Sequence, residues 1–383
     1  MDSTTIKEER GSLAEVAREF LRLGLIAYGG PAAHVAMMEE QFVRRRGWLT
    51  RERFLDLLGA VNLLPGPSST ELAIYFGEIR AGLAGLIVAG ACFILPAATL
   101  VTGLAWAYMK FGALPQVAGL LFGIKPVVVA LVAQAVWNLG KTALRHVALA
   151  ALAVSVILLA MVGVHAVWLL IGAGLLWMIL REGKRLASNR AALGAWFGLG
   201  TSAMGGALGV LPIFFYFLKI GAVLIGSGYV LLPILRGDLV LKLHWLTDAQ
   251  LLDAVAVSQA TPGPFFTVAT FIGFILAGWK GAALATLGMF LPAFVYVGIT
   301  SGFLPKLRKS PLAGAFLDGV NAAAVALMAF VGWQFGRAAL VNIPAVILAV
   351  LSGVLVFRYK VNSTWLVLGG AAAGIVLRVF GWG

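Results

Sequence analysis

The segment Asn62-Leu-Leu-Pro-Gly-Pro-Ser-Ser-Thr70 returns 197 residues further along the chain as Gln259-Ala-Thr-Pro-Gly-Pro-Phe-Phe-Thr267. Proline removes a backbone donor and glycine widens the allowed backbone dihedrals, so each Pro-Gly-Pro triplet is predicted to end one helix and start another. Two copies of such a break indicate that the chain is built from a duplicated unit with an interrupted helix near its start.

Matches on both sides of the triplets extend the duplication over the chain. The offset of 197 also pairs Phe20–Gly24 with Phe217–Gly221, and after a one-residue gap an offset of 196 pairs Pro96 with Pro292. We therefore predict a first membrane domain, a basic linker with one extra span, and a second homologous membrane domain, with the respective bounds 1–181, 182–212 and 213–383.

The composition defines the class of protein. Of the 383 residues, 61% are hydrophobic and 12% are charged, whereas about 25% of the residues of a soluble globular protein are charged. A soluble fold cannot cover that much apolar surface with so few charges. This excludes a soluble enzyme, a nucleic-acid-binding protein, a disordered chain and a disulfide scaffold. It predicts an all-α polytopic membrane protein, with room for about twelve spans.

Cysteine and histidine usage points away from metal or redox chemistry. The single cysteine, Cys92, lies inside an apolar run, and the four histidines show no ligand spacing. Disulfides need a second cysteine, and metal sites need clustered ligands. We therefore expect no disulfide, no metal site and no cofactor.

The basic residues, which give a net charge of +13, lie mostly between apolar runs. If each broken pair of segments returns to the side from which it entered, one side of the membrane receives Arg44, Arg45, Arg46, Arg51, Arg53, Arg80, Lys141, Arg145, Arg181, Lys184, Arg185 and Arg190. The opposite side of the first domain then receives only Lys110. This positive-inside pattern, with an extra span near 195–212, predicts that the second repeat is inverted.

Each domain is predicted to begin with two interrupted helical segments. The breaks fall at Gly29, Gly30, Pro31, Pro65, Gly66 and Pro67 in the first domain and at Gly226, Gly228, Pro262, Gly263 and Pro264 in the second. Inverted repeats with broken helices are typical of secondary transporters, which bind substrate where the half-helices meet. We expect the substrate site at these breaks.

A half-helix that starts after Pro-Gly-Pro presents free N–H groups and the positive end of its dipole. Hydroxyl and amide side chains surround these ends, and we predict that they bind a small oxyanion. They are Asn62, Ser68, Ser69, Thr70, Gln259 and Thr267. The alternative is that the triplets only kink the helices and that the hydroxyls only cap them.

Few charged residues lie inside the apolar runs. Lys125 is predicted to offset part of the substrate's charge, with snorkelling to the headgroups as the alternative. Glu71 has no carboxylate at the equivalent position and is the candidate for proton coupling. Asp56 and Asp253 lie near helix starts, where we expect them to cap the dipole. His34, as an isolated histidine, is expected to be structural.

These motifs resemble those of the chromate ion transporter family, in its long form with two fused homologous domains. The likeness covers nearly the whole chain and rests on Tyr28-Gly-Gly-Pro-Ala-Ala-His34, Gly47-Trp-Leu-Thr50, Trp245-Leu-Thr-Asp248 and the two Pro-Gly-Pro blocks. One departure is Asn62, where the family pattern has a glutamine like Gln259.

The resemblance implies a secondary transporter in the bacterial inner membrane. It would export chromate, a sulfate-like divalent oxyanion, by alternating access and so confer chromate resistance. The expected partners are this oxyanion and the lipid bilayer, with no nucleic acid, and a homodimer is left open. An importer of sulfate or another oxyanion and an anion channel share the same features. No enzymatic activity is expected, because chromate reduction would need a redox group.

Overall fold

The computed structural model describes residues 11–28, 31–61, 64–112, 115–186, 209–224, 228–301 and 311–380. These residues form helices joined by short turns, and none of them lies in a strand. Four predicted site residues, Gly29, Gly30, Asn62 and Gly226, lie outside the described residues, as does most of the predicted extra span near 195–212.

The first repeat contains seven α-helices and one π-helical turn among the described residues. They are α1 (Leu13–Ile26), α2 (Pro31–Met38), the π-helical turn η1 (Glu39–Arg45), α3 (Arg51–Val61), α4 (Ser68–Phe111), α5 (Pro115–Ala143), α6 (Val147–Met161) and α7 (Ala166–Leu186).

The second repeat follows the same order with additional short turns. It comprises α8 (Val210–Val223), the 3-10 turn η3 (Gly228–Val230), α9 (Leu231–Leu235), the π-helical turn η4 (Arg236–Lys242), α10 (Asp248–Ala260), the 3-10 turn η5 (Phe265–Thr267), α11 (Val268–Thr300), α13 (Pro311–Ala339), α14 (Ile343–Arg358) and α15 (Ser363–Val379).

The helices have the length and surface of membrane spans. Within the described part of the chain, four segments are long and apolar enough to cross a bilayer: Ser68–Phe111, Gly119–Ala143, Phe265–Thr300 and Pro311–Ala339. Large apolar side chains point outward from the bundle, among them Leu83, Val154, Leu180, Leu211 and Trp333. Such a surface is stable against lipid and not against water, so the predicted helical membrane fold is confirmed.

The duplication is visible in the backbone. α4 and α11 each bend sharply at a glycine with positive φ, Gly82 (64°) and Gly278 (60°). Before and after the bend, two further glycines bring the arms together, because a Cβ on Gly77 would strike the carbonyl oxygen of Gly85. The equivalent residues of α11 make the same close approach. Each bend therefore turns the helix back after a short first arm.

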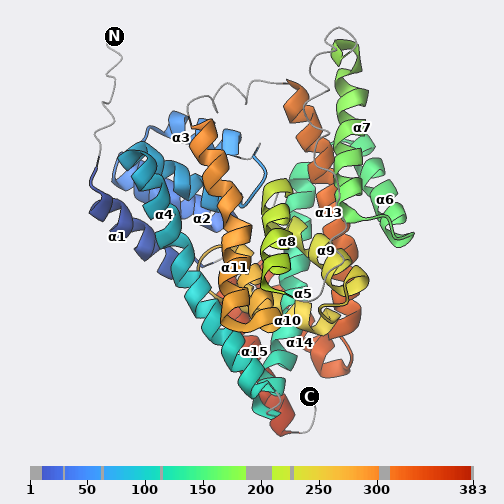
Figure 1. Ribbon diagram of the computed structural model, residues 1–383. Helices are drawn as coiled ribbons and strands as arrows, with labels where there is room; N and C mark the ends of the chain where they lie inside the picture. Colours follow the sequence, from blue (N-terminus) through green and yellow to red (C-terminus); the bar gives the residue numbers. More distant parts are fainter. Residues whose placement is uncertain are drawn as a thin grey trace, which may run out of the picture.

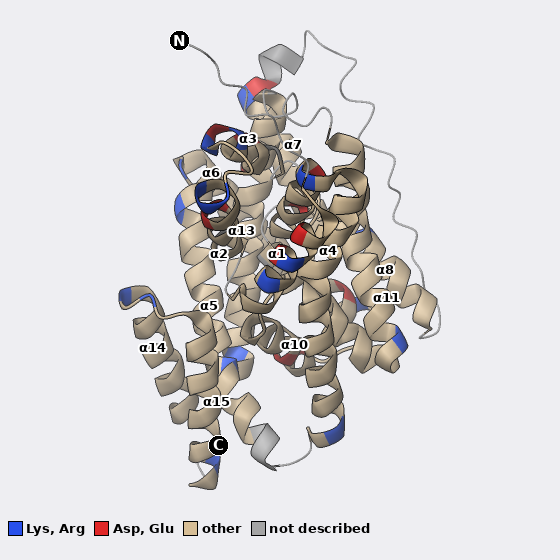
Figure 2. Ribbon diagram, turned by 90° about the vertical axis from the view of Figure 1, so that its left-hand side faces the viewer, with Lys and Arg blue, Asp and Glu red and all other residues tan. Residues whose placement is uncertain are grey.

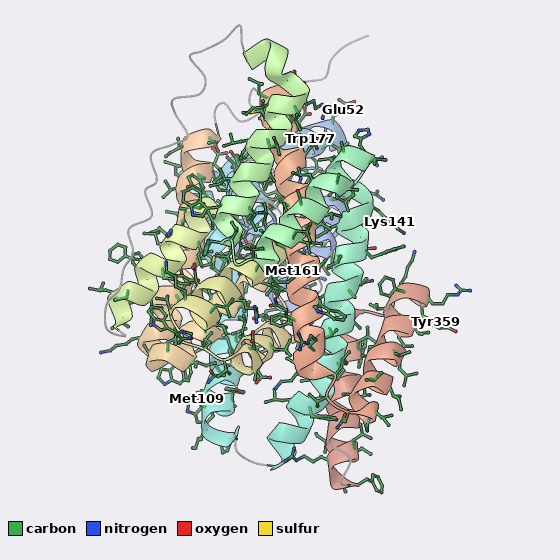
Figure 3. The ribbon with its side chains drawn as sticks, turned by 90° about the vertical axis from the view of Figure 1, so that its right-hand side faces the viewer. Glu52, Met109, Lys141, Met161, Trp177 and Tyr359 are labelled. Carbon is green, nitrogen blue, oxygen red and sulfur yellow. The ribbon has the colours of Figure 1, made fainter. Side chains whose placement is uncertain are left out.

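The two repeats run in opposite directions. In Figure 1, the long arm of α4 descends from its bend, whereas the long arm of α11 ascends, and α5 and α13 are likewise antiparallel. Figure 3 places Glu52 and Lys141 toward one end of the bundle and Met109 toward the other. The two repeats are thus inverted, as the charge pattern predicts.

Basic residues are unevenly distributed along the bundle. In Figure 2, most of them gather in the half that carries α1, α3 and the end of α7, and few lie where α15 ends. In that half Arg46 and Arg80 pair with Glu15 at 3.1 and 3.0 Å, which ties η1 and the bend of α4 to the start of α1. The first broken hairpin therefore returns to the end from which it started.

Candidate substrate site at the two helix breaks

Each Pro-Gly-Pro break is joined to the opposite repeat by a backbone hydrogen bond. The N–H of Gly66 donates to the carbonyl of Leu224 at 2.6 Å, and the N–H of Gly263 donates to the carbonyl of Ala27 at 2.8 Å. Leu224 and Ala27 are the C-terminal caps of α8 and α1, at equivalent positions of the repeats. The two hydrogen bonds are therefore related by the pseudo-two-fold symmetry, and they fix both breaks at the interface between the repeats.

Glycine is required at the centre of both triplets. Gly66 has a φ of 137° and Gly263 a φ of 93°, a region that residues with a side chain rarely adopt. A Cβ on Gly66 would also collide with Oε1 of Glu71, and one on Gly263 would lie 2.5 Å from the Cβ of Ala97. Conformation and space together exclude a side chain at these positions.

Polar groups surround the N-terminus of α4, which directly follows the first break. Pro67 caps α4 without a side-chain hydrogen bond, and its carbonyl accepts from the N–H groups of Thr70 and Glu71 at 2.7 and 3.0 Å. The earlier N–H groups, of Ser68 and Ser69, precede any helical acceptor and point toward the break. Thr70 is fully buried, and its hydroxyl has no hydrogen-bond partner among the described residues.

His34 links the two breaks. Its Nε2 lies 3.2 Å from the Ala27 carbonyl, the same oxygen that accepts from Gly263, and its Nδ1 lies 3.4 Å from Ser69 Oγ. A carbonyl can only accept, so in the neutral ring Nε2 carries the proton and Nδ1 accepts from the Ser69 hydroxyl. A chain of three hydrogen bonds thus runs from Ser69 to Gly263. The sequence places His34 beside the first break but gives no sign of this connection.

Glu71 is a buried carboxyl with no ion pair to a basic side chain among the described residues. It is 0% exposed, and neither side-chain oxygen has a hydrogen-bond partner among the described residues. Tyr75 lies one turn further along α4, and Tyr296 lies on α11. Their hydroxyls are engaged elsewhere, that of Tyr75 with Thr300 at 2.6 Å and that of Tyr296 with the Ala222 carbonyl at 2.8 Å. The carboxyl therefore faces the break with its hydrogen-bonding capacity unused.

The second break offers fewer polar groups. Gln259 is 6% exposed, and its Nε2 has no partner among the described residues. Thr267 lies in η5, and its hydroxyl donates to the Pro264 carbonyl at 2.9 Å, so that donor is used locally. Leu231 and Phe266 stand where the first repeat has His34 and Ser69. The two halves of the site are therefore unequal, one polar and one mostly apolar.

Lys125 does not lie at either break. Its Nζ lies 3.2 Å from Asp253 Oδ1, and the hydroxyl of Tyr108 donates to Asp253 Oδ2 at 3.1 Å. Asp253 and Gln259 are on α10 and six residues apart, which corresponds to about 9 Å of helix rise. The predicted cation is thus placed beside the breaks along the repeat interface and is already paired.

The prediction that Asp253 caps a helix is wrong. α10 begins at Asp248 and is capped by Thr247, whose side chain accepts from the N–H of Gln250 while the Gln250 side chain accepts from Thr247. This reciprocal capping box satisfies the helix start. Asp253 lies one turn further on, where it is 3% exposed and meets Lys125. Its partner in the duplication, Asp56, is exposed on α3.

The site is rich in donors and poor in cations. The Thr70 hydroxyl and the Gln259 amide are buried and lack partners among the described residues, and the N–H groups at the start of α4 lie beside Thr70. Buried polar groups without partners are costly, which points to a ligand that they bind. Donors without a full positive charge suit a small oxyanion that must be released again.

The chain matches one family model twice. Residues 14–178 and 211–375 each match the chromate transporter family. The chromate transport protein of Cupriavidus metallidurans is 33% identical over 374 residues, which cover 94% of this chain and 92% of that protein. The chromate transport protein of Pseudomonas aeruginosa is 31% identical, with 95% and 92% covered.

More distant relatives include proteins without an assigned substrate. An uncharacterized transporter of Methanocaldococcus jannaschii is 25% identical, covering 97% of this chain and 96% of that protein. No solved structure is significantly similar to the chain. The duplicated match follows the duplication seen in the sequence and in the backbone.

Proposed function

Because the chain belongs to the chromate transporter family, we propose that it exports chromate across the bacterial inner membrane by alternating access. The relatives named for chromate transport support chromate as the substrate, and the apolar helices support a membrane transporter. The observation that carries the mechanism is the reciprocal pair of hydrogen bonds from Gly66 to Leu224 and from Gly263 to Ala27, which holds two broken helices at the repeat interface.

The substrate's oxygens would meet the donors of both breaks. We assign the polar half of the site to the N-terminus of α4 with Ser68, Ser69 and Thr70, and to Asn62 before it. Gln259 and Thr267 would close the site from the second repeat. Lys125 would contribute its charge only after it separates from Asp253. A tetrahedral oxyanion presents four separate oxygen acceptors to such a set of donors, whereas chloride is a single, smaller acceptor atom, so selection would favour oxyanions.

Export needs no chemical energy beyond the membrane potential. An inside-negative potential favours the exit of anions by about 2.3 kcal/mol per charge per 100 mV. Glu71 adds a proton-dependent element, because a charged carboxylate beside the site would repel the anion. Glu71 would carry a proton while the anion is bound, and the proton would accompany the substrate.

Uptake of labelled chromate into everted vesicles tests the proposal. We expect uptake that saturates, increases with a vesicle-interior-positive potential and is inhibited by sulfate. Uptake only into right-side-out vesicles would identify an oxyanion importer instead. A flux that stays linear to high chromate concentration would identify an anion channel.

Replacement of donors tests the site itself. Gln259→Leu removes the buried amide without changing the length of the side chain greatly, and we expect KM for chromate to rise about tenfold, the effect of losing one good hydrogen bond to a charged group. The matched control is Gln134→Leu, because Gln134 lies on α5 and contacts the Val356 carbonyl. Equal KM values for the two variants would exclude Gln259 from the site.

A further inference from the structure

The C-terminus of α8 meets the Glu71 carboxyl at Gly66. A Cβ on Gly66 would collide with Glu71 Oε1 and would lie 3.8 Å from the carbonyl oxygen of Gly221, which is in the last turn of α8. The N–H of Gly66 also donates to the carbonyl of Leu224, the residue that caps α8. A carboxyl and the end of a helix are thus brought together inside the protein.

This place is rich in acceptors and has no positive charge among the described residues. Glu71 is fully buried, and neither of its side-chain oxygens has a hydrogen-bond partner in the described part of the chain. The last carbonyls of a helix lack donors from their own helix and carry the negative end of its dipole. The donors that reach the end of α8, the N–H of Gly66 and the hydroxyl of Tyr296, are both uncharged. A buried carboxylate beside such a helix end requires a cation.

The second break has the same geometry and other chemistry. A Cβ on Gly263 would lie 3.5 Å from the carbonyl oxygen of Gly24, the equivalent of Gly221. The end of α1 also faces a second donor, because His34 Nε2 lies 3.2 Å from the Ala27 carbonyl that accepts from Gly263. The end of α1 is therefore satisfied by side-chain and backbone donors of this chain.

Two residue differences separate the break at α8 from the break at α1. Leu231 occupies the position of His34 and cannot donate to the Leu224 carbonyl, whereas Val268 occupies the position of Glu71. The geometry of a break therefore does not require an acidic residue. The first break combines an added carboxylate with the loss of a donor, and both changes favour a positive ion at this place.

We propose that Glu71 and the C-terminal carbonyls of α8, that of Gly221 foremost, bind a sodium ion. Carboxylate and carbonyl oxygens are the ligands that hard cations prefer, and half-helix C-termini coordinate sodium in transporters with broken helices. A single carboxylate is neutralised by a single positive charge. No group of three acidic, histidine or cysteine side chains that could hold a metal ion occurs among the described residues, which favours a monovalent ion over a divalent one.

Close packing favours the smaller alkali ion. A Cβ on Gly221 would collide with the carbonyl oxygen of Met289 on α11, just as a Cβ on Gly66 would collide with Glu71. The backbones of α8, α11 and the first break are therefore too close for a methyl group at either glycine. Sodium fits such a place better than potassium does.

Sodium at Glu71 would promote the binding of the oxyanion. The donors assigned to the substrate begin at Ser68, within one turn of Glu71 on the same helix, so an ionised Glu71 repels the anion. Sodium would remove this repulsion as a proton does, and the two would exclude each other on one carboxyl. Because coupling of binding is reciprocal, sodium and the oxyanion should raise each other's affinity by the same factor. This coupling rests on the proposed function, whereas the sodium site does not.

Thermal unfolding of the purified protein in detergent tests the site without substrate. We expect the melting temperature to rise and saturate with sodium chloride, and to rise much less with potassium chloride or N-methylglucamine chloride at equal ionic strength. Glu71→Gln keeps the shape of the side chain without its charge and should lose the sodium-specific rise. Glu52→Gln, which alters an exposed residue of α3, should keep it. An equal rise with all three cations, or an unchanged sodium response in Glu71→Gln, would overturn the inference.

Binding of labelled sodium to the unaltered protein is a measurement that needs no variant. We expect saturable binding of a single ion per chain, displaced by unlabelled sodium and not by the same concentration of potassium. The half-saturating sodium concentration should fall several-fold when chromate or sulfate replaces chloride. The absence of saturable binding would overturn the inference.

The outcomes for the sodium site and for the proposed function are distinguishable. Sodium binding that depends on Glu71, in a protein that neither responds to chromate nor transports it, would support the site and contradict the proposed function. Chromate uptake into vesicles by a protein that binds no sodium would overturn the inference and leave the proposed function in place.

Discussion

At the residue scale, Gly66 and Gly263 carry the strictest backbone demands, because their φ angles are 137° and 93°. We expect Gly66→Ala and Gly263→Ala each to destabilise the protein by about 1–3 kcal/mol, the cost of a side chain in such a conformation. Thermal unfolding in detergent measures the effect. Gly103→Ala is the control, because a Cβ there meets open space within α4 and alanine favours the helix. Three equal melting temperatures would contradict the assigned strain.

His34 and Ser69 should behave as one unit. His34→Leu introduces the residue of the second repeat but leaves the Ser69 hydroxyl without its partner, at a cost of about 1–3 kcal/mol. Adding Ser69→Ala removes the stranded group, so the double variant should be less destabilised than the sum of the two single variants. Melting temperatures of the four proteins complete the cycle. Strict additivity would mean that the 3.4 Å contact between His34 Nδ1 and Ser69 Oγ contributes nothing to the stability of the protein.

Glu71 is expected to make transport depend on the proton gradient. Glu71→Gln keeps the shape of the side chain but cannot exchange a proton, so chromate uptake should no longer respond to a pH gradient at constant potential. Glu52→Gln is the matched control, since Glu52 is exposed on α3. If the Glu71→Gln protein keeps the full response to the pH gradient, then another group couples transport to protons or the mechanism has no proton coupling.

Local sequence patterns predict those site residues whose partners are neighbours in the chain, and only the structure reveals those whose partners are distant in the chain. Both Pro-Gly-Pro triplets and the hydroxyls after the first are recognisable because their chemistry depends on neighbours in the chain. His34 and Asp253 act through partners 35 and 128 positions away, which no local pattern encodes. Asp253 also lies near a helix start, and only the reciprocal cap of Thr247 and Gln250 frees it for another role.

At the scale of the element, one contact occurs twice with its charges reversed. Arg236 of η4 pairs with Asp248 of α10 at 2.6 Å, and the duplication places there Glu39 of η1 and Arg51 of α3, which lie 3.6 Å apart. Each ion pair joins the two helical segments of a broken hairpin where the chain turns between them. The two positions of this contact require opposite charges, but either position can carry the positive one.

Exchanging the charges of the second pair tests this reading. Arg236→Asp or Asp248→Arg alone places two like charges together, and we expect each to lower stability by about 1 kcal/mol. The double variant restores an attractive pair with the polarity of the first repeat, and its melting temperature should recover most of the loss. A double variant less stable than both single variants would show that the order of the charges matters.

Most elements could be predicted because proline, glycine and hydropathy mark their ends. The predicted boundary between residues 79 and 82 coincides with the bend at Ala81 and Gly82. The π-helical turns η1 and η4 were not predicted, since residues 32–43 read as one helical piece. A π-turn adds one residue to a helix without changing which side chains are apolar, so the periodicity does not reveal it.

At the scale of the whole molecule, the uneven distribution of basic residues predicts the orientation. In a Cys92→Ser background, we expect Lys110→Cys to react with a membrane-impermeant maleimide added to intact cells and Arg145→Cys to react only after permeabilisation. Cytoplasmic retention of basic loops provides the physical reason. The opposite labelling pattern would show that the protein has the reverse orientation in the membrane. The substrate would then load from outside the cell, which would contradict the proposed export.

The inversion of the repeats could be predicted from charge, but the docking of one hairpin could not. α3 and α10 have similar positions in the duplication, and their burial differs because α10 meets α5 and α15 while α3 meets η1 and α4. The contact between Lys125 and Asp253 joins α5 to α10 across 128 positions of sequence, so no local pattern reveals it.

The reciprocal hydrogen bonds of Gly66 and Gly263 have a consequence for how small such a protein can be. Each glycine finds its acceptor on the other repeat, at Leu224 and at Ala27. A polypeptide that held only one repeat would leave this N–H group unsatisfied in the interior, together with the carbonyl that caps its first helix. Two such half-length chains inserted in opposite orientations would satisfy both groups at once. Gene fusion then secures a one-to-one ratio and a fixed relative orientation, and it frees each half to diverge in chemistry.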